Sequence, residues 1–440
     1  MEMEKNIGIL GLGKSGIAAA NLAVKLGYNV FASDSKEIKT KNLNKKIIKE
    51  LGGHSDKILS SDVIIKSPGI NLNIPILKDA RKKNIKIISE LAFSLKNSKY
   101  KKIIAITGTN GKTTTTDLVS KIVKSVHKDS IVTGNIGYPL SDKASKTTKN
   151  TFITIELSSY QLEDTPYFKP DISILLNISP DHLEHHKTIN AYIKAKENIL
   201  VNQKSVDFAI INYDDKICRK ISKKTKAKVF FFSKSNIKNG VFYNNGNIII
   251  NIKDKNIVIK PKINIIGMHN IENILAATAA SYALEINPLI VEKVISKYKG
   301  VKHRIEFVRT LNGVNYYNDS KSTNIDSTRV ALESFNKDIL LIMGGRDKGN
   351  AYTPIKELIK QRVKSIFLIG EASSKIKKDL NDYTAFIYCN DVENAVKQIF
   401  KTAVGGDTVL LSPACASFDQ FKNFEERGEV FKKAVWSLDT

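Results

Sequence analysis

The segment TGTNGKTT at residues 107–114 has the residue types and spacing of a phosphate-binding loop. It follows the apolar run 103–106 and precedes a stretch long enough for a helix. Backbone N–H groups of such a loop surround the phosphates of ATP, Lys112 neutralises them, and the Thr113 hydroxyl can bind Mg²⁺. The loop departs from the general G-x-x-x-x-G-K-S/T pattern, because Ile106 occupies the first glycine position. Its strand–loop–helix setting nevertheless predicts an ATP site.

A second glycine-rich loop, GLGKSG at residues 11–16, also lies between a predicted strand and a predicted helix. Its glycines permit a tight turn and let a phosphate approach the N–H groups at the helix N-terminus. Asp34 ends the next predicted strand, where a carboxylate can bind a ribose or a base. By itself this pattern suits NAD or any other nucleotide diphosphate, and a glycine turn without a ligand is the alternative.

Three further residues could take part in chemistry, although each has a more ordinary interpretation. Glu156 directly follows an apolar run of strand length, so its carboxylate could reach a metal at the edge of a parallel sheet. His182 lies in a turn, and on its residue type alone it is a hydrogen-bonding loop residue, because Mg²⁺ prefers oxygen ligands. Lys196 on a predicted helix would ordinarily be a surface charge. We expect His185 and His186 to be solvated.

The elements that must position these residues alternate apolar runs with helix-length stretches, as in parallel α/β sheets. We predict strands at 6–10, 28–32, 63–65, 87–90, 103–106, 152–155, 172–176, 339–343, 365–369 and 408–411. Between about 205 and 265, short β-rich runs separated by Asn, Gly and Lys turns indicate a small antiparallel addition. An alanine-rich helix follows at 273–284.

Composition excludes several classes of protein. At 440 residues, 42% hydrophobic and 26% charged, the chain is long enough for roughly three globular domains. The net charge of +25 invites a nucleic-acid function, but only eight of the 69 basic residues are arginine and the lysines are spread evenly. Three cysteines form no disulfide framework, and no apolar run reaches the roughly 20 residues that span a bilayer. We therefore expect a cytoplasmic protein with no specific nucleic acid and no membrane insertion.

The phosphate loop resembles that of the Mur ligases and folylpolyglutamate synthetases, which use ATP to join an amino acid to a carboxylate. The resemblance extends over nearly the whole chain, through GNIGYP (134–139), ELSSYQLE (156–163), SPDHLEHH (179–186), GMHNIEN (267–273), NDSKSTN (318–324), GGRDKG (344–349) and SPACASFDQFKNFEERG (412–428). The first and last regions are most similar to the branch that adds D-glutamate to UDP-N-acetylmuramoyl-L-alanine.

This resemblance implies an α/β protein of three domains. They are a UDP-binding Rossmann-like domain at 1–92, a central P-loop ATPase domain at 93–300 with a parallel sheet and a small β addition, and a Rossmann-like domain at 301–440 that binds the incoming amino acid. The implied reaction passes through an acyl phosphate and a tetrahedral intermediate in a cytoplasmic step of peptidoglycan synthesis. The implied cofactors are ATP and Mg²⁺ at two sites, and we expect a monomer.

The resemblance also assigns residues to the ligands. It implies that ATP binds to Gly108, Thr109, Asn110, Gly111, Lys112, Thr113, Thr114, Asn273, Arg304 and Asp319. The UDP substrate is implied to bind to Ser15, Asp34, Lys36, Ser67, Gly69, Asn135 and Ser158. D-Glutamate is implied to bind to Lys321, Thr323, Lys348, Ser417 and Phe424. The implied Mg²⁺ ligands are Thr113, Glu156, His182 and Lys196, the last as a carbamate formed with CO₂; the catalytic set is Lys112, Glu156, His182 and Lys196.

Several alternatives stay open at this stage. Phe424 could be a core residue, and Ser417 could be a helix N-cap. A sibling ligase that adds L-alanine or extends folate with glutamate is the nearest rival function. An NAD-dependent oxidoreductase is a more distant one, because the phosphate loop at 107–114 has no role in it and no hydride-transfer constellation is recognisable.

Overall fold

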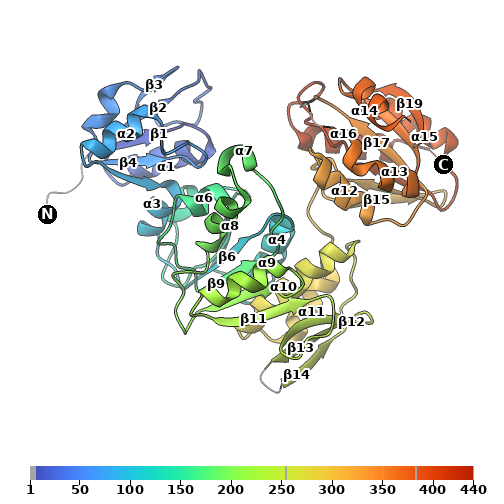
Figure 1. Cartoon of the computed structure of the whole chain (residues 1–440), viewed down its shortest axis with the longest axis horizontal. Coiled ribbons are helices and arrows are strands. Elements are labelled where there is room, and N and C mark those ends of the chain that lie inside the picture. Colours follow the sequence, from blue (N-terminus) through green and yellow to red (C-terminus); the bar gives the residue numbers. More distant parts are fainter. Residues whose placement is uncertain are drawn as a thin grey trace. The chain divides into compact units, whose positions relative to one another are not determined.

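The strands of this protein are rich in isoleucine, valine and leucine, and most of them are buried in largely parallel sheets. The computed structural model describes residues 6–135, 137–252, 255–347, 349, 351–381 and 384–439. Within them the strands form three sheets, and the chain divides into two compact units (Figure 1). The first unit holds residues 1–261 and 272–294, and the second unit holds 262–271 and 295–440.

The first sheet is parallel throughout, in the order β3-β2-β1-β4-β5. Its strands are β1 (Asn6–Leu10), β2 (Asn29–Asp34), β3 (Ile48–Leu51), β4 (Val63–Lys66) and β5 (Lys86–Ser89). One apolar cluster joins it to α1 (Lys14–Lys25), α3 (Glu90–Lys96) and α5 (Ser141–Ala144). Another apolar cluster includes η1 (Asp56–Ser60) and α2 (Pro75–Lys82). This half of a doubly wound fold places the ends of β1, β2 and β4 around one cavity.

The second sheet runs in the order β14-β13-β12-β11-β10-β9-β6-β8-β7. Its strands are β6 (Lys102–Thr107), β7 (Ser130–Gly134), β8 (Phe152–Glu156), β9 (Ile172–Leu175), β10 (Phe208–Asn212), β11 (Lys228–Ser233), β12 (Gly240–Asn244), β13 (Asn247–Ile252) and β14 (Lys255–Ile259). The antiparallel addition expected from residue 205 is smaller than predicted. Strands β10 and β11 continue the parallel sheet, and the antiparallel pairs are β12–β13 and β13–β14.

Helices of the central region follow its strands. They are α4 (Lys112–Val126), α6 (Ser159–Glu163), α7 (Leu183–His186), α8 (Ile189–Glu197), α9 (Lys216–Ile221), η2 (Ser222–Lys224), α10 (Met268–Ala283) and α11 (Pro288–Lys297). Helix α4 packs on β6, β7 and β8, while residues of α6, α8 and α9 join the sheet in an apolar cluster. The alanine-rich helix predicted at 273–284 is α10, which begins five residues earlier.

The third sheet has the order β15-β16-β20-β17-β18-β19, with only the β15–β16 pair antiparallel among the described residues. Its strands are β15 (Glu306–Leu311), β16 (Val314–Asn318), β17 (Ile339–Gly344), β18 (Val363–Ile369), β19 (Ala385–Asn390) and β20 (Thr408–Leu411). Apolar clusters join it to α12 (Ile325–Glu333), η3 (Thr353–Ile355), α13 (Lys356–Arg362), α14 (Ser373–Leu380), α15 (Val392–Thr402) and α16 (Phe424–Trp436). The predicted α/β class is therefore correct, and the domain boundaries at 92/93 and 300/301 stay predictions.

No helix within the described residues is both long enough and apolar enough to cross a bilayer.

Candidate active site

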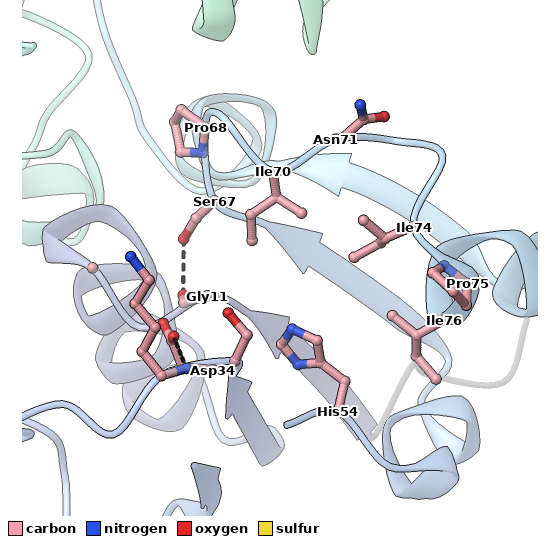
Figure 2. Close-up of a pocket in the computed structure, with 13 residues that line it drawn as sticks. Gly11, Asp34, His54, Ser67, Pro68, Ile70, Asn71, Ile74, Pro75 and Ile76 are labelled. Carbon is pink, nitrogen blue, oxygen red and sulfur yellow. Dashed lines mark hydrogen bonds between the residues drawn. The ribbon is translucent and has the colours of Figure 1, made fainter. Parts of the chain in front are cut away.

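A cavity of about 720 Å³ opens at the carboxyl ends of β1, β2 and β4 (Figure 2). Its wall includes the β1–α1 glycine loop, Asp34, Lys36, His54 and Ser67. Three isoleucines form its apolar side, namely Ile70 and Ile74 before α2 and Ile76 in the first turn of α2. Phosphate-binding backbone beside an apolar wall suits a nucleotide, because the wall accepts a flat base.

Hydrogen bonds hold the polar side of this cavity in shape. The Asp34 carboxylate accepts the backbone N–H of Leu12 at 2.7 Å and that of Lys36 at 2.9 Å. The Ser67 hydroxyl donates to the carbonyl of Gly11 at 2.8 Å. A Cβ at Gly16 would collide with the same carbonyl, so this turn requires glycine. Asp34 therefore shapes the glycine loop in addition to its predicted role as a ligand.

The other four residues predicted to bind the UDP substrate do not line this cavity. Ser15 is half-buried in the first turn of α1, and Gly69 lines a neighbouring cavity. Ser158 caps α6, where it accepts the N–H of Gln161 at 3.3 Å and donates to that side chain at 3.0 Å. Exposed Asn135 donates its amide to Glu156 at 3.0 Å.

The phosphate loop joins β6 to α4 as predicted. Gly111 caps α4 with a φ of +84°, and a Cβ there would collide with the side-chain oxygen of Asn273. That oxygen also accepts the Thr115 hydroxyl at 3.1 Å. Lys112 bends back over the loop and donates to the carbonyls of Gly108 and Thr109 at 2.9 and 2.7 Å. Asn273 thus contacts the phosphate loop at Gly111, within the predicted ATP site.

Two residues that the sequence did not reveal also hold the phosphate loop. Asn177, after β9, accepts the N–H of Asn110 at 2.8 Å and donates to its carbonyl at 3.1 Å. The phenol of Tyr192 on α8 lies 3.0 Å from the Thr109 hydroxyl. A polar residue after a strand adjacent to β6 is a signal that could have identified Asn177, because such ends meet at one sheet edge.

Glu156 is the last residue of β8, and its register partner on β6 is Ile106, directly before the loop. The side chain is 2% exposed. Its Oε1 accepts the Asn135 amide, but its Oε2 is buried and has no hydrogen-bond partner among the described residues. A buried, unpartnered carboxylate oxygen is costly in an apolar environment and is a preferred ligand for a hard cation. The site therefore fits Mg²⁺ at Glu156.

Lys196 points from α8 to the same loop and is 1% exposed. Its ammonium donates to the Gly108 carbonyl at 2.8 Å and lies 4.7 Å from the centre of the Tyr192 ring. Burial, with a smaller contribution from the nearby charge of Lys112, holds the pKa of Lys196 well below its usual value. A neutral amine is the form that reacts with CO₂, so this environment is compatible with the predicted carbamate.

The contacts of the predicted metal ligand His182 are with its own segment and with Tyr160. His182 precedes α7 with a φ of +52°, its side chain is 43% exposed, and its ring nitrogens lie 3.5 and 3.6 Å from Asp181 and Glu184. Among the described residues, no hydrogen bond or ion pair joins it to Glu156 or Lys196.

The expectation that His185 and His186 are solvated is wrong. Helix α7 turns both rings against α6, so that the His185 side chain is 21% exposed and that of His186 only 1%. Their partners on α6 are Glu163 and Ser159.

In the second unit, Asp319 follows β16 and is completely buried. Its carboxylate accepts the backbone N–H of Ile305 at 3.2 Å and the hydroxyl of Ser412 at 2.8 Å. Burial raises the pKa of Asp319, while the positive charge of Arg304 lowers it. Arg304 donates to Ser322 at 3.2 Å. Asp319 therefore fixes the loop that carries Arg304 as well as standing at a predicted ATP position.

The predicted D-glutamate residues also lie in the second unit. The ammonium of Lys321 is 6.0 Å from the centre of the Phe424 ring, which begins α16 and is half-buried. Thr323 is half-buried and Ser417 is buried. The N-cap of α16 is Asn423, so Ser417 does not cap that helix. Lys348 lies outside the described residues.

Family models match three successive parts of the chain. The N-terminal domain of MurD-like Mur ligases matches residues 5–89, the Mur ligase middle domain matches 106–281, and the glutamate ligase domain of Mur ligases matches 303–415. The chain belongs to the Mur ligase family.

Relatives of this Mur ligase match it from end to end. It is 43% identical to the UDP-N-acetylmuramoylalanine–D-glutamate ligase of Elusimicrobium minutum, over 98% of this chain and 97% of the relative. It is 40% identical to the protein of the same name from Clostridioides difficile, over 99% of both. The predicted resemblance is thereby confirmed.

Solved structures show the same fold. The UDP-N-acetylmuramate–alanine ligase MurC of Thermotoga maritima superposes with a TM-score of 0.61 at 20% identity, covering 98% of this Mur ligase and 99% of MurC. The MurF ligase of Thermotoga maritima, solved in complex with ADP, gives 0.63 at 18% identity, with 98% and 95% covered.

One residue of this Mur ligase that sequence reasoning did not single out is Arg427 on α16. It is 1% exposed, and its guanidinium donates to the carbonyls of Ser320 and Cys415 at 2.9 and 3.1 Å. Burial lowers the pKa of Arg427 to about 10. Arg427 thereby connects the segment that holds Lys321 with the segment that holds Ser417.

Proposed function

We propose that this Mur ligase adds D-glutamate to UDP-N-acetylmuramoyl-L-alanine and converts ATP to ADP and phosphate, in a cytoplasmic step of peptidoglycan synthesis. The observation that carries the proposal is the end-to-end identity of 43% to a ligase named for that reaction. The phosphate loop, with buried Glu156 and Lys196 beside it, supplies the machinery that ATP-dependent amide formation requires.

A carboxylate does not react with an amine until its oxygen becomes a leaving group. The carboxylate of the muramoyl-alanine substrate attacks the γ-phosphorus of ATP, which forms an acyl phosphate and releases ADP. The amine of D-glutamate then attacks the acyl carbon, and the tetrahedral intermediate expels phosphate as the amine loses a proton. The loop N–H groups and Lys112 hold the phosphates in line and neutralise their charge, which is most of the catalysis in phosphoryl transfer.

Thr113 and Glu156 would hold one Mg²⁺, and His182 with carbamylated Lys196 would hold a second. Bound Mg²⁺ supplies positive charge at the phosphate oxygens. The unpartnered Oε2 of Glu156 and the neutral amine favoured at Lys196 support these assignments.

The substrate assignments form part of the same proposal. The UDP end occupies the cavity of Figure 2, with Asp34, Lys36 and Ser67 at its polar side. The proposed D-glutamate residues are Lys321, Thr323, Lys348, Ser417 and Phe424. Ammonium and hydroxyl donors at these positions suit the two carboxylates of D-glutamate.

Phosphate release from ATP tests the function. With UDP-N-acetylmuramoyl-L-alanine present, D-glutamate should stimulate release, whereas L-glutamate and L-alanine should not. Stimulation by L-alanine with UDP-N-acetylmuramate, or by L-glutamate with a folate, would assign the chain to a sibling ligase instead.

A further inference from the structure

Glu163, His185 and His186 form a side-chain cluster between α6 and α7 that the proposed reaction does not use. One potential ligand atom from each residue lies within 4.8 Å of the other two. The Nε2 of His185 is 2.8 Å from Glu163 Oε2, and the Nδ1 of His186 is 3.8 Å from the same oxygen. Two imidazoles and a carboxylate therefore converge on one small volume.

The His186 ring has one satisfied nitrogen and one unsatisfied nitrogen. Its Nε2 lies 2.9 Å from the Ser159 hydroxyl. Its Nδ1 is buried and has no hydrogen-bond partner among the described residues, although the side chain is only 1% exposed. The lone pair of Nδ1 is therefore available inside the cluster, and leaving it unused costs free energy.

The spacing and the donor types select a class of ion. Bonds of 2.0–2.2 Å to a tetrahedral Zn²⁺ place its ligand atoms about 3.3–3.6 Å apart. The separations of Glu163 Oε2 from the two histidine nitrogens, 2.8 and 3.8 Å, lie on either side of that range, and the two histidine ligand atoms lie within 4.8 Å of each other. Imidazole nitrogens suit zinc and similar transition metals, whereas Mg²⁺ and Ca²⁺ prefer oxygen.

We propose that Glu163, His185 and His186 bind a single divalent transition-metal ion, with Zn²⁺ as the representative, at a site distinct from the Mg²⁺ residues. His186 ligates through Nδ1 while its Nε2–H donates to Ser159, which fixes the tautomer as second partners of metal ligands commonly do. Glu163 and His185 also line a cavity of about 410 Å³, which leaves room for water as a fourth ligand.

Three cationic side chains line this cavity, and each donates to a group other than Glu163. Lys66 pairs with Asp164 at 2.6 Å, Arg81 donates to the Leu72 carbonyl at 2.6 Å, and Lys187 donates to the Glu184 carbonyl at 2.7 Å. The bound ion would join the end of α6 to the end of α7 and so restrain the segment that begins with His182.

Zinc binding to the full-length protein tests the proposal. Zn²⁺ is titrated against a chromophoric chelator in excess Mg²⁺, and Co²⁺ is added separately to record the visible absorption of a site with nitrogen ligands. The wild-type protein should bind one equivalent of Zn²⁺. Glu163→Gln and His185→Gln should each weaken binding by at least about tenfold, and Ser159→Ala by about tenfold. His127→Gln, in the same unit but stacked on Phe152, is the matched control and should bind as wild type.

The variant His182→Gln separates this site from the proposed Mg²⁺ site. Retention of the zinc equivalent in His182→Gln supports the proposal. Loss of zinc in His182→Gln with retention in His185→Gln would overturn it, as would the same affinity in Glu163→Gln and wild type. Thermal melting without metal shows that each variant is folded, and Zn²⁺ should raise the melting temperature of wild type but not of His185→Gln.

Discussion

At the scale of single residues, the strongest indication of function comes from buried charged groups beside the phosphate loop. A carboxylate or an amine removed from water is unfavourable unless a partner compensates it. Among the described residues, Glu156 retains one unpartnered oxygen, and the hydrogen bonds of Lys196 go to neutral oxygens. Both residues therefore sit in environments that a bound cation, or a carbamate with its cation, would make favourable.

Replacing Glu156 tests this directly. Glu156→Gln keeps an Oε1 acceptor for Asn135 but loses the charge on the unpartnered oxygen. We expect ligase turnover to fall by about 100-fold or more, because an electrostatic partner of the transition state is removed. Steady-state phosphate release over a range of Mg²⁺ concentrations measures the effect. Glu357→Gln, an exposed position in the first turn of α13, is the control, and equal activity in the two variants would contradict a metal role for Glu156.

Asn177 should control ATP affinity through the loop. Asn177→Ala removes two hydrogen bonds to Asn110, each worth about 1 kcal/mol, so the KM for ATP should rise roughly tenfold or more. Asn177→Asp keeps an acceptor but loses the donor and adds negative charge near the phosphates, so its KM should rise further. ATP titrations measure both values. A smaller increase for Asn177→Asp than for Asn177→Ala would show that the loop does not bind phosphate at this point.

How far these residues could be predicted depends on how local their signals are. Glu156 ends an apolar strand, and the sequence pattern alone predicts that position. Lys196 contacts Gly108, which lies 88 residues earlier, so no local pattern distinguishes it from the other lysines. The family resemblance alone identified it. His186 was misassigned because its burial depends on α7 folding back against α6.

At the scale of elements, most of the predicted strands lie inside a sheet and have an apolar run, since parallel strands are covered on both faces. The missed strands β3, β7, β15 and β19 are sheet edges with exposed or half-buried positions. Strand β16 (VNYYN) was missed inside its sheet, because polar residues interrupt its apolar run. The predicted extent of the antiparallel addition was also wrong, because a short β-rich run does not indicate whether its strand pairs in parallel or antiparallel.

The contact between α3 and α5 contains a pH-sensitive group. Burial raises the pKa of Glu90, although its Oε1 accepts hydrogen bonds from the Ser141 N–H, the Ser141 hydroxyl and the Ser94 hydroxyl. A carboxyl whose folded pKa is raised contributes stability that is complete below about 4.5 and is lost as the pH rises through the folded pKa.

Glu90→Gln should therefore be more stable than wild type at pH 7, because the amide oxygen can accept the same hydrogen bonds without a buried charge. The advantage should vanish below about pH 4.5, the ordinary value of this carboxyl. Urea unfolding at several pH values measures the difference. A constant difference across the range would mean that the pKa of Glu90 is the same in the folded and unfolded states, so that burial does not raise it.

At the scale of the whole molecule, each sheet uses the same arrangement. Asp34 ends β2, Glu156 ends β8 and Asp319 follows β16, so each sheet presents an acidic side chain at the carboxyl end of a strand with a parallel neighbour. Ligands of open α/β sheets bind at that edge. The fold thus determines where function can lie, while the individual side chains determine which chemistry occurs there.

The net charge of +25 belongs to the molecule as a whole, and its substrates under the proposed function are all anionic. A positive surface raises the encounter rate with anions, and salt screens this attraction over a Debye length of about 8 Å at physiological ionic strength. Raising the NaCl concentration should therefore increase the KM for ATP and for the UDP substrate while leaving kcat nearly unchanged. Potassium acetate at the same ionic strength is the control salt. Potassium glutamate is unsuitable, because L-glutamate resembles a substrate. An unchanged KM in both salts would show that the lysine excess has no part in substrate capture. A fall in kcat alone would point instead to a salt effect on a step after substrate binding.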